Sequence, residues 1–276
     1  MRATSSRQLT SLGQRRQTAT SSCTAATESP WPRSDATAQS LRWTTVSPTA
    51  RSARSASARP PVRRGRKAPP ATVVLLVRHG VTPTTGKMLP GQAAGLHLSE
   101  KGHEQAGAAA GRIAALTKAP TAVYASPLER TRETAAPIAR ALGLRVRTAP
   151  GLVEVDVGDW TEKSLTRLYR TKEWPTVQRW PGGFRFPGGE SFAEMSVRSM
   201  DTMLSLVADH PGETIVAVSH ADPIKAIVAA AAGMPLDLLQ RLVISPCSIS
   251  ALLFTAGGPV VLCTNSTGSL NELALS

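Results

Sequence analysis

Short apolar runs separated by polar stretches begin at residue 72, and they predict the strands of a folded domain. Residues 72–77 (TVVLLV) are almost entirely β-branched or aliphatic, which is typical of a strand buried on both faces. Residues 214–219 (TIVAVS) have the same character. The remaining strands, of which the last two form a hairpin around a Gly-Gly pair, are expected at residues 121–125, 144–148, 249–254 and 260–263.

Capping residues between these runs predict where helices begin. Ser99 precedes a stretch whose apolar positions between residues 106 and 116 recur at helical spacing. The Ser-Pro pair at 126–127 and the Asp-Pro pair at 222–223 each combine a capping residue with a proline suited to the first helical turn. The helix after residue 126 should end near residue 142, and another helix should begin near Glu190 after a glycine-rich turn.

The order of these elements predicts the fold class. Strands alternate with helices from residue 71 onward, which favours a three-layer α/β/α sandwich with a mostly parallel central sheet. Hydrophobic residues make up 41% of the chain, enough for one sizeable core. Residues 71–276 are therefore expected to form a single domain.

Residues 1–70 differ from the domain in composition and charge. Ser, Thr, Ala, Arg and Pro dominate this segment and no helical or strand period persists, so it is expected to be a disordered tail. It holds 12 Arg and one Lys against Glu28 and Asp35, a net charge of +11, whereas the whole chain carries +13. The domain itself is thus near neutral, and its charge gives no reason to expect a nucleic-acid partner.

Four explanations of the basic tail stay open. It could be a solvated segment without function, a transit peptide for organelle import, an arm for nucleic acid or a membrane surface, or upstream sequence translated from a misassigned start codon. No apolar run approaches the roughly 18–20 residues of a membrane span. The three cysteines are widely spaced, so neither a disulfide framework nor a zinc site is predicted, and the simplest location is the cytoplasm.

Basic side chains follow the predicted strands at one edge of the sheet. Arg78 and His79 come directly after the strand at 72–77, and His220 directly follows the strand at 214–219. Arg130 lies in the first turn of the helix after the strand at 121–125. Ligands of open α/β sheets bind beyond the carboxyl ends of the strands, so these side chains should converge there. Because arginine forks and helix N-termini both bind anions, the sequence predicts a pocket for a dianionic phosphate.

Five motifs follow one another along the chain: Leu76-Val77-Arg78-His79-Gly80, Ser126-Pro127-Leu128-Glu129-Arg130-Thr131, Glu154 ahead of Gly158-Asp159-Trp160, Pro187-Gly188-Gly189-Glu190-Ser191, and Val218-Ser219-His220. In this order they resemble the histidine phosphatase superfamily, which has the phosphoglycerate-mutase-like fold. One motif alone is a weak signal, whereas five in sequence are a specific one. Within the superfamily the chain is similar to actinobacterial proteins labelled probable phosphomutases, and the resemblance covers about residues 72–273.

The resemblance implies a role for each central residue. His79 is the nucleophile that forms a phosphohistidine, and a neutral imidazole needs little activation for this near pH 7. Arg78, Arg130 and His220 would neutralise charge on the non-bridging oxygens, with His220 working best when protonated. Glu154 would protonate the leaving alkoxide and then activate water. Neither a metal ion nor another cofactor is expected.

Two further phosphate contacts follow from the resemblance, and each departs from the family pattern. Ala221 stands where Gly is frequent, but its backbone N–H can still donate. Thr85 stands where Asn is common, and its hydroxyl has a shorter reach. Asp156 is a rival to Glu154, although the spacing to the following Gly-Asp-Trp sequence favours Glu154.

Other polar and aromatic residues near the motifs are expected to be structural. Arg132 should lie on a solvated helix face, since the first-turn position favours Arg130 as the phosphate ligand. Trp160 should pack in the interior rather than stack on a substrate. The remaining histidines are expected to be ordinary surface residues: His97, His103 and His210.

The function implied by these features is a metal-independent phosphatase that hydrolyses a small-molecule phosphomonoester. The alternatives are a phosphoglycerate-mutase-type phosphomutase and a phospholigand-binding pseudoenzyme. A mutase must hold a bisphosphate and exclude water, which requires a second cationic cluster and a lid. Residues 160–186 do carry basic side chains, but the stretch is short, which favours the phosphatase. Another interpretation is that these basic side chains select a substrate with a second acidic group. The sequence indicates neither the substrate nor the oligomeric state.

Overall fold

The computed structural model describes residues 69–268, and this part of the chain contains a mixed six-stranded sheet with the order β4-β3-β6-β1-β7-β8. The first four strands in that order are parallel to one another, and β7 is antiparallel to both of its neighbours, β1 and β8, so the predicted mostly parallel sheet is confirmed. Each strand predicted from the sequence overlaps an observed one. The strands are β1 Thr72–Arg78, β3 Ala122–Ala125, β4 Val146–Thr148, β6 Thr214–Ser219, β7 Ile249–Thr255 and β8 Gly258–Ser266.

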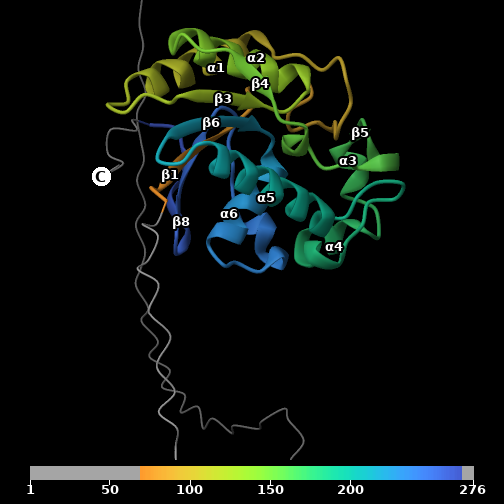
Figure 1. Cartoon of the computed structure of the whole chain (residues 1–276). Coiled ribbons are helices and arrows are strands. Elements are labelled where there is room, and N and C mark those ends of the chain that lie inside the picture. Colours follow the sequence, from red (N-terminus) through yellow and green to blue (C-terminus); the bar gives the residue numbers. More distant parts are fainter. Residues whose placement is uncertain (1–68, 269–276) are drawn as a thin grey trace, which may run out of the picture. The chain divides into compact units, whose positions relative to one another are not determined.

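Helices cover both faces of this sheet (Figure 1). The side chains of β1 alternate between the two cores that result. Leu75 lies in the core with Ile138 of α2, and Leu76 lies in the other core with Ile224 of α6. The predicted α/β/α sandwich is therefore confirmed. The long helices are α1 Glu100–Ala114 and α2 Glu129–Ala141 on one face, and α5 Phe192–Asp209 and α6 Ala221–Ala231 on the other.

A satellite core lies under the segment that joins β4 to α5. Trp160 is buried there against Trp174, Phe184 and Phe186, with ring centroids 5.6 to 6.2 Å apart, which confirms its predicted packing role. The short strands β2 and β5 pair antiparallel beside it. The short elements are β2 Met88–Leu89, β5 Lys163–Ser164, α3 Leu165–Leu168, α4 Trp174–Arg179, and the 3-10 turns η1 Pro150–Leu152, η2 Gly158–Trp160, η3 Pro181–Gly183 and η4 Leu236–Arg241.

Two helices begin at other residues than predicted. α2 begins three residues after Ser126, whose hydroxyl instead lies 2.9 Å from Nε2 of His220. α6 begins one residue before Asp222, whose carboxylate lies 3.2 Å from the ammonium group of Lys225. The cap predicted at Ser99 is confirmed, since its hydroxyl accepts from a backbone N–H in the first turn of α1. At Ser126 a tertiary contact has taken the side chain away from the helix end, whereas Asp222 forms an ion pair within the first turns of α6.

The predicted disorder of residues 1–70 falls almost wholly outside the described residues, as does the end of the chain from residue 269. The described residues begin with Pro69 and Pro70, shortly before β1. None of the helices within residues 69–268 combines the length and the apolar character that crossing a membrane requires.

Candidate active site

The parallel register of β1 and β6 brings two histidines to the same edge of the sheet. Arg78 is paired with Ser219 at the end of the ladder, so His79 and His220 follow at the same level. Their ring centroids lie 5.2 Å apart with an angle of 61° between the planes. Both side chains are buried. The two histidines that the sequence places after separate strands thus share one site.

A hydrogen bond to the backbone determines which ring nitrogen of His79 is free. Nδ1 lies 2.8 Å from the carbonyl oxygen of Gly80, an acceptor that only an N–H can satisfy. Nδ1 therefore carries the proton and the lone pair remains on Nε2. Burial, reinforced by the positive charges of Arg78 and Arg130, lowers the pKa of His79 to about 3. The ring is thus neutral near pH 7, with Nε2 available as a nucleophile.

Ser126 holds the ring of His220 on one side. Its hydroxyl lies 2.9 Å from Nε2 of that ring, and its backbone N–H donates to the carbonyl of Val218 at 3.0 Å. Nδ1 of His220 is buried and has no hydrogen-bond partner within residues 69–268. Burial and the charge of Arg130 hold the pKa of His220 well below its usual range. With the Ser126 hydroxyl donating to Nε2, the neutral ring presents Nδ1–H to a ligand.

Two arginines border the histidines, and backbone carbonyls orient them. Nη1 of Arg78 donates to the carbonyl of Ile244 at 2.6 Å. Arg130 is fully buried, and its two terminal nitrogens donate to the carbonyls of Gly91 at 2.7 Å and Ala93 at 3.3 Å. These bonds fix both guanidinium groups, yet in each arginine Nε has no partner among the described residues.

Unpaired donors are concentrated at this edge of the sheet. Of the eight buried side-chain atoms without a partner in the described domain, three are Nε of Arg78, Nε of Arg130 and Nδ1 of His220. Each unpaired buried polar group costs about 1–3 kcal/mol, so such a concentration needs an explanation. A tetrahedral oxyanion that accepts from all three matches their chemistry. Between residues 69 and 268, no group of three or more His, Cys, Asp or Glu side chains is arranged to hold a metal ion.

Glu154 is the carboxyl group whose charge acts on both of these arginines, Arg78 and Arg130. Its Oε1 accepts from the backbone N–H of Val155 at 3.0 Å. Burial, followed by the negative charge of Asp222, raises the pKa of Glu154 to about 7, although the arginines and the Val155 N–H oppose the shift. A carboxyl group with this pKa can both give and take a proton near neutral pH.

The three remaining candidates from the sequence are the two expected phosphate contacts, Thr85 and Ala221, and the rival acid, Asp156. The hydroxyl of Thr85 accepts from the backbone N–H of Thr82 and lies 2.9 Å from the Thr82 hydroxyl, so it is engaged within its own loop. Ala221 is the first residue of α6, where a backbone N–H has no intrahelical acceptor. The carboxylate of Asp156 accepts from the backbone N–H of Gly158 at 2.9 Å, which is a turn contact.

Sequence reasoning missed three residues beside the site. It assigns Ser126 and Asp222 to helix caps, because a capping residue followed by proline is the stronger local signal. Thr134 carries no such signal, yet its hydroxyl accepts from the backbone N–H of Gly80 at 3.1 Å and donates to the carbonyl of Arg130 at 2.7 Å. It therefore links the loop of the nucleophile to α2.

The three remaining histidines do not all lie on the surface. His97 and His103 are exposed, as predicted, but the prediction for His210 is wrong. His210 is buried, with Nε2 2.9 Å from the hydroxyl of Tyr124 and Nδ1 2.7 Å from the carboxylate of Glu213. Its polar sequence neighbours indicate a surface turn, whereas these hydrogen bonds permit burial.

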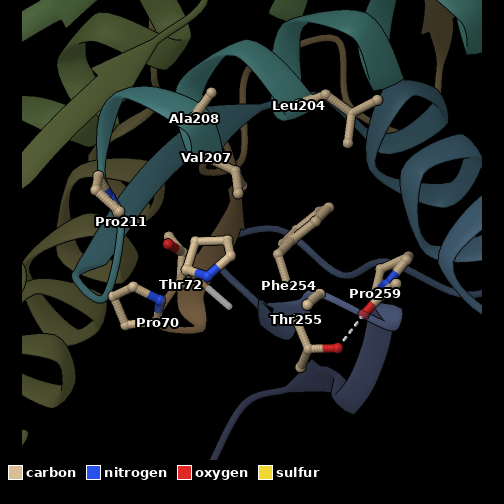
Figure 2. Close-up of a pocket in the computed structure, with 12 residues that line it drawn as sticks. Pro70, Thr72, Leu204, Val207, Ala208, Pro211, Phe254, Thr255 and Pro259 are labelled. Carbon is tan, nitrogen blue, oxygen red and sulfur yellow. Dashed lines mark hydrogen bonds between the residues drawn. The ribbon is translucent and has the colours of Figure 1, made fainter. Parts of the chain in front are cut away.

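An apolar cavity lies at the opposite end of β1 from His79 (Figure 2). Thr72, the first residue of β1, borders it together with Val207 of α5 and Phe254 of β7. Its volume is about 230 Å³, and no charged side chain lines it. A phosphate group would find no cationic partner in this cavity, so the edge with the histidines is the candidate active site.

Comparison with known protein families shows whether these residues belong to a known kind of anion-binding site. The family model described as Histidine phosphatase superfamily (branch 1) matches residues 74–267. The chain belongs to the histidine phosphatase superfamily. This membership confirms the resemblance carried by the five motifs.

Two relatives of this member of the histidine phosphatase superfamily carry different names. The Mycobacterium tuberculosis protein named Bifunctional protein Rv2228c is 34% identical over 203 residues, which are 72% of this chain and 55% of that protein. The Erwinia tasmaniensis protein named Probable phosphoglycerate mutase GpmB is 33% identical over 210 residues, covering 73% of this chain and 96% of that protein. The chain thus spans about half the length of the first relative and nearly all of the second.

Solved structures of phosphatases share the fold. The mycobacterial glucosyl-3-phosphoglycerate phosphatase matches with a TM-score of 0.65 and 26% identity, over 71% of this chain and all of that one (100%). The Entamoeba histolytica phosphoserine phosphatase in complex with 3-phosphoglyceric acid matches with a TM-score of 0.63 and 27% identity, over 71% of this chain and 98% of that one. Both agree with the predicted phosphoglycerate-mutase-like sandwich.

Proposed function

We propose that the protein is a metal-independent phosphatase that hydrolyses a small-molecule phosphomonoester through a phosphohistidine at His79. The observation that carries the proposal is the group of unpaired donors on Arg78, Arg130 and His220 in the neighbourhood of His79, whose Nε2 is free. An oxyanion held by these donors would present its phosphorus atom to that nitrogen. Positioning and charge stabilisation are the main requirements of phosphoryl transfer.

In the first step, Nε2 of His79 forms a bond to phosphorus while the bond from phosphorus to the ester oxygen breaks. The leaving oxygen takes the proton of Glu154, whose pKa of about 7 keeps a substantial fraction protonated at neutral pH. Arg78, Arg130 and His220 stabilise the negative charge that spreads over the three non-bridging oxygens.

In the second step, a water molecule attacks the phosphorus atom of the phosphohistidine. The Glu154 carboxylate takes a proton from that water, and the bond between phosphorus and Nε2 of His79 breaks. Inorganic phosphate leaves, and Glu154 is protonated again for the next cycle. One carboxyl group thus serves as acid and then as base, which suits a pKa near the operating pH.

The charge of His220 in this scheme differs from the sequence-based expectation of a protonated ring. Burial and the nearby arginines favour the neutral form of His220 in the protein alone. The neutral ring still donates through Nδ1–H while Ser126 donates to Nε2. A phosphate dianion next to the ring would raise its pKa and strengthen that hydrogen bond.

We propose small phosphorylated carboxylic acids as the preferred substrate class. Phosphoserine and 3-phosphoglyceric acid, which are named with the Entamoeba histolytica structures, each join a carboxylate to a phosphate ester. The segment around β5 and α3 of this chain could interact with such a second anionic group through its basic residues. These residues are Lys163, Arg167, Arg170 and Lys172.

A phosphomutase is the second candidate, because relatives of 33% and 34% identity carry the name Probable phosphoglycerate mutase GpmB. Both activities share the phosphohistidine and differ in the group that accepts the phosphoryl group from it. Water is the acceptor in a phosphatase, whereas a second hydroxyl of the substrate is the acceptor in a mutase.

The experiment that separates these activities uses the full-length protein in the presence of EDTA. Phosphoserine, 3-phosphoglycerate and 4-nitrophenyl phosphate are each incubated with it, and both inorganic phosphate and phosphoglycerate isomers are measured. We expect phosphate release that disappears in the His79→Ala variant. Isomerisation without net release would support the mutase, and phosphate binding without any turnover would indicate a pseudoenzyme.

A further inference from the structure

We infer that the ion pair between Arg198 and Glu190 is a positioning device for Glu154, an inference that rests on the proposed acid–base role of Glu154. Arg198 lies in the second turn of α5, and Glu190 lies in the turn that precedes the same helix. Neither residue belongs to the group of histidines and arginines around the phosphate site. Their hydrogen bonds instead converge on the loop that carries Glu154.

Arg198 binds the backbone on the N-terminal side of that loop. Its Nη1 donates to the carbonyls of Gly151 and Val153, both at 2.9 Å, and its Nη2 donates to the carbonyl of Glu154 itself at 2.9 Å. A planar guanidinium holds its donors in a fixed arrangement, so three carbonyls within four residues are fixed relative to one another. The backbone of Glu154 is thereby tied to α5.

Glu190 orients this guanidinium and binds the loop on its C-terminal side. Its carboxylate accepts from Nε of Arg198 at 3.0 Å and from Nη2 at 2.5 Å, which is a bidentate arrangement. The same carboxylate accepts from the backbone N–H of Asp156 at 2.9 Å, and the backbone N–H of Glu190 donates to the Asp156 carbonyl at 3.0 Å. The pair therefore holds the chain both before and after residue 155.

Close packing reinforces these contacts. A Cβ atom placed on Gly189 would lie only 2.3 Å from the carbonyl oxygen of Asp156, so the glycine-rich turn lies directly against the loop backbone. On the other side, the side chain of Gln92 donates to the carbonyl of Glu154 at 2.8 Å. The loop has little room to shift unless the ion pair is broken. The turn that the sequence predicts to be structural thus helps to place the acid.

The same helix offers a control residue that stabilises the fold without touching the Glu154 loop. Glu194 forms an exposed ion pair with Arg185 and accepts from the backbone N–H of Ser191 in a capping box. Its side chain is 52% exposed, compared with 17% for Glu190. Loss of a capping residue lowers helix stability, so the Glu194→Ala variant reports a purely structural defect.

The test compares two aryl phosphates with the full-length protein. The leaving group of 4-nitrophenyl phosphate departs readily without a proton, whereas that of phenyl phosphate depends on one. For both esters kcat/KM reports the formation of the same phosphohistidine. The ratio of the two values is therefore independent of the fraction of folded enzyme and measures how well Glu154 delivers its proton.

We expect Arg198→Met to lower kcat/KM about tenfold or more for phenyl phosphate and less than about threefold for 4-nitrophenyl phosphate. Glu190→Gln, which keeps the shape of the side chain, should shift the ratio in the same direction by less, and Arg198→Lys should lie between Arg198→Met and the wild type. Glu194→Ala should lower the Tm and leave the ratio unchanged.

Wild-type ratios in both Arg198→Met and Glu190→Gln would overturn the inference while leaving the proposed function intact. If Arg198→Met does not fold, the ratio in Glu190→Gln decides. If Glu154→Gln itself keeps the wild-type ratio, the acid role of Glu154 fails and the inference fails with it. The proposed function fails if the wild type releases phosphate from neither aryl ester and from neither phosphoserine nor 3-phosphoglycerate.

Discussion

The two ends of the central sheet differ in the hydrogen bonds of their buried histidines. Beyond the carboxyl ends of β1 and β6, Nδ1 of His220 and the Nε atoms of two arginines lack partners among the described residues. Toward the other end, both ring nitrogens of His210 are paired, one with Tyr124 and one with Glu213. Unpaired donors lower the stability of a fold, whereas paired ones are nearly neutral or stabilising. The difference indicates that one end is built for a ligand and the other for the fold.

The predicted effects of removing a histidine separate the two ends most strongly. His79→Ala removes the proposed nucleophile, so phosphate release from 4-nitrophenyl phosphate should fall by at least about a thousandfold. His210→Ala should keep activity within about threefold and lower the Tm instead, because a buried network is broken. Steady-state kinetics and thermal unfolding by circular dichroism measure both outcomes. Equal losses of activity in the two variants would contradict the proposed difference in function between the two ends of the sheet.

The arginines of α2 sharpen the same comparison within one helix. Arg130 is fully buried with a free Nε, while Arg132 is exposed. Arg130→Met should lower kcat/KM by about a hundredfold or more, since it removes charge stabilisation from the transferring phosphoryl group. Arg132→Met should stay within about twofold of the wild type. Similar kinetics for the two variants would show that burial does not mark the phosphate ligand.

The raised pKa of Glu154 predicts that the stability of the folded protein falls as pH rises. The pKa is about 7 in the folded protein and near 4.5 for an unperturbed glutamate in the unfolded chain, so folding takes up a proton between these two pH values. The stabilisation is fully present below pH 4.5 and is lost as pH rises through 7. Glu154→Gln cannot lose it, so this variant should have a Tm higher than the wild type by roughly 4 °C or more at pH 8.

At pH 4 the Tm difference between Glu154→Gln and the wild type should be small, since the wild-type carboxyl is protonated there in both states. Differential scanning calorimetry at the two pH values measures both. A Tm difference of the same size at pH 4 and pH 8 would show that the substitution acts through packing rather than through charge.

The smallest predicted effect concerns the network of His210. Tyr124→Phe leaves Nε2 of His210 without its partner, which should lower the free energy of unfolding by about 1–3 kcal/mol. Phosphatase activity should be unchanged, because the network lies away from the phosphate site. Urea unfolding at pH 7 measures the change. A loss of activity at unchanged stability would place Tyr124 in the function of the protein.

Sequence patterns predict the site better than its surroundings, for physical reasons. Buried parallel strands place their following residues at one edge, so His79 and His220 could be brought together without coordinates. Ser126 and Asp222 could not be assigned correctly, because the same residue types also cap helices. The burial of His210 depends on Tyr124, which lies 86 residues away in the sequence. The contacts of Arg198 likewise exist only once α5 packs against the loop of Glu154.

The central claim is that the phosphoryl group is transferred to Nε2 of His79, and trapping the phosphoenzyme tests it most directly. Glu154→Gln should accumulate this species with 4-nitrophenyl phosphate, because the ester needs no acid to react and the base for hydrolysis is gone. Alkaline quenching preserves phosphohistidine, and mass spectrometry with phosphorus NMR locates the modified nitrogen. We expect one phosphoryl group per chain on Nε2 of His79 and none in the variant that also carries His79→Ala. Phosphorylation of another residue, or phosphate release that persists in His79→Ala, would contradict the account.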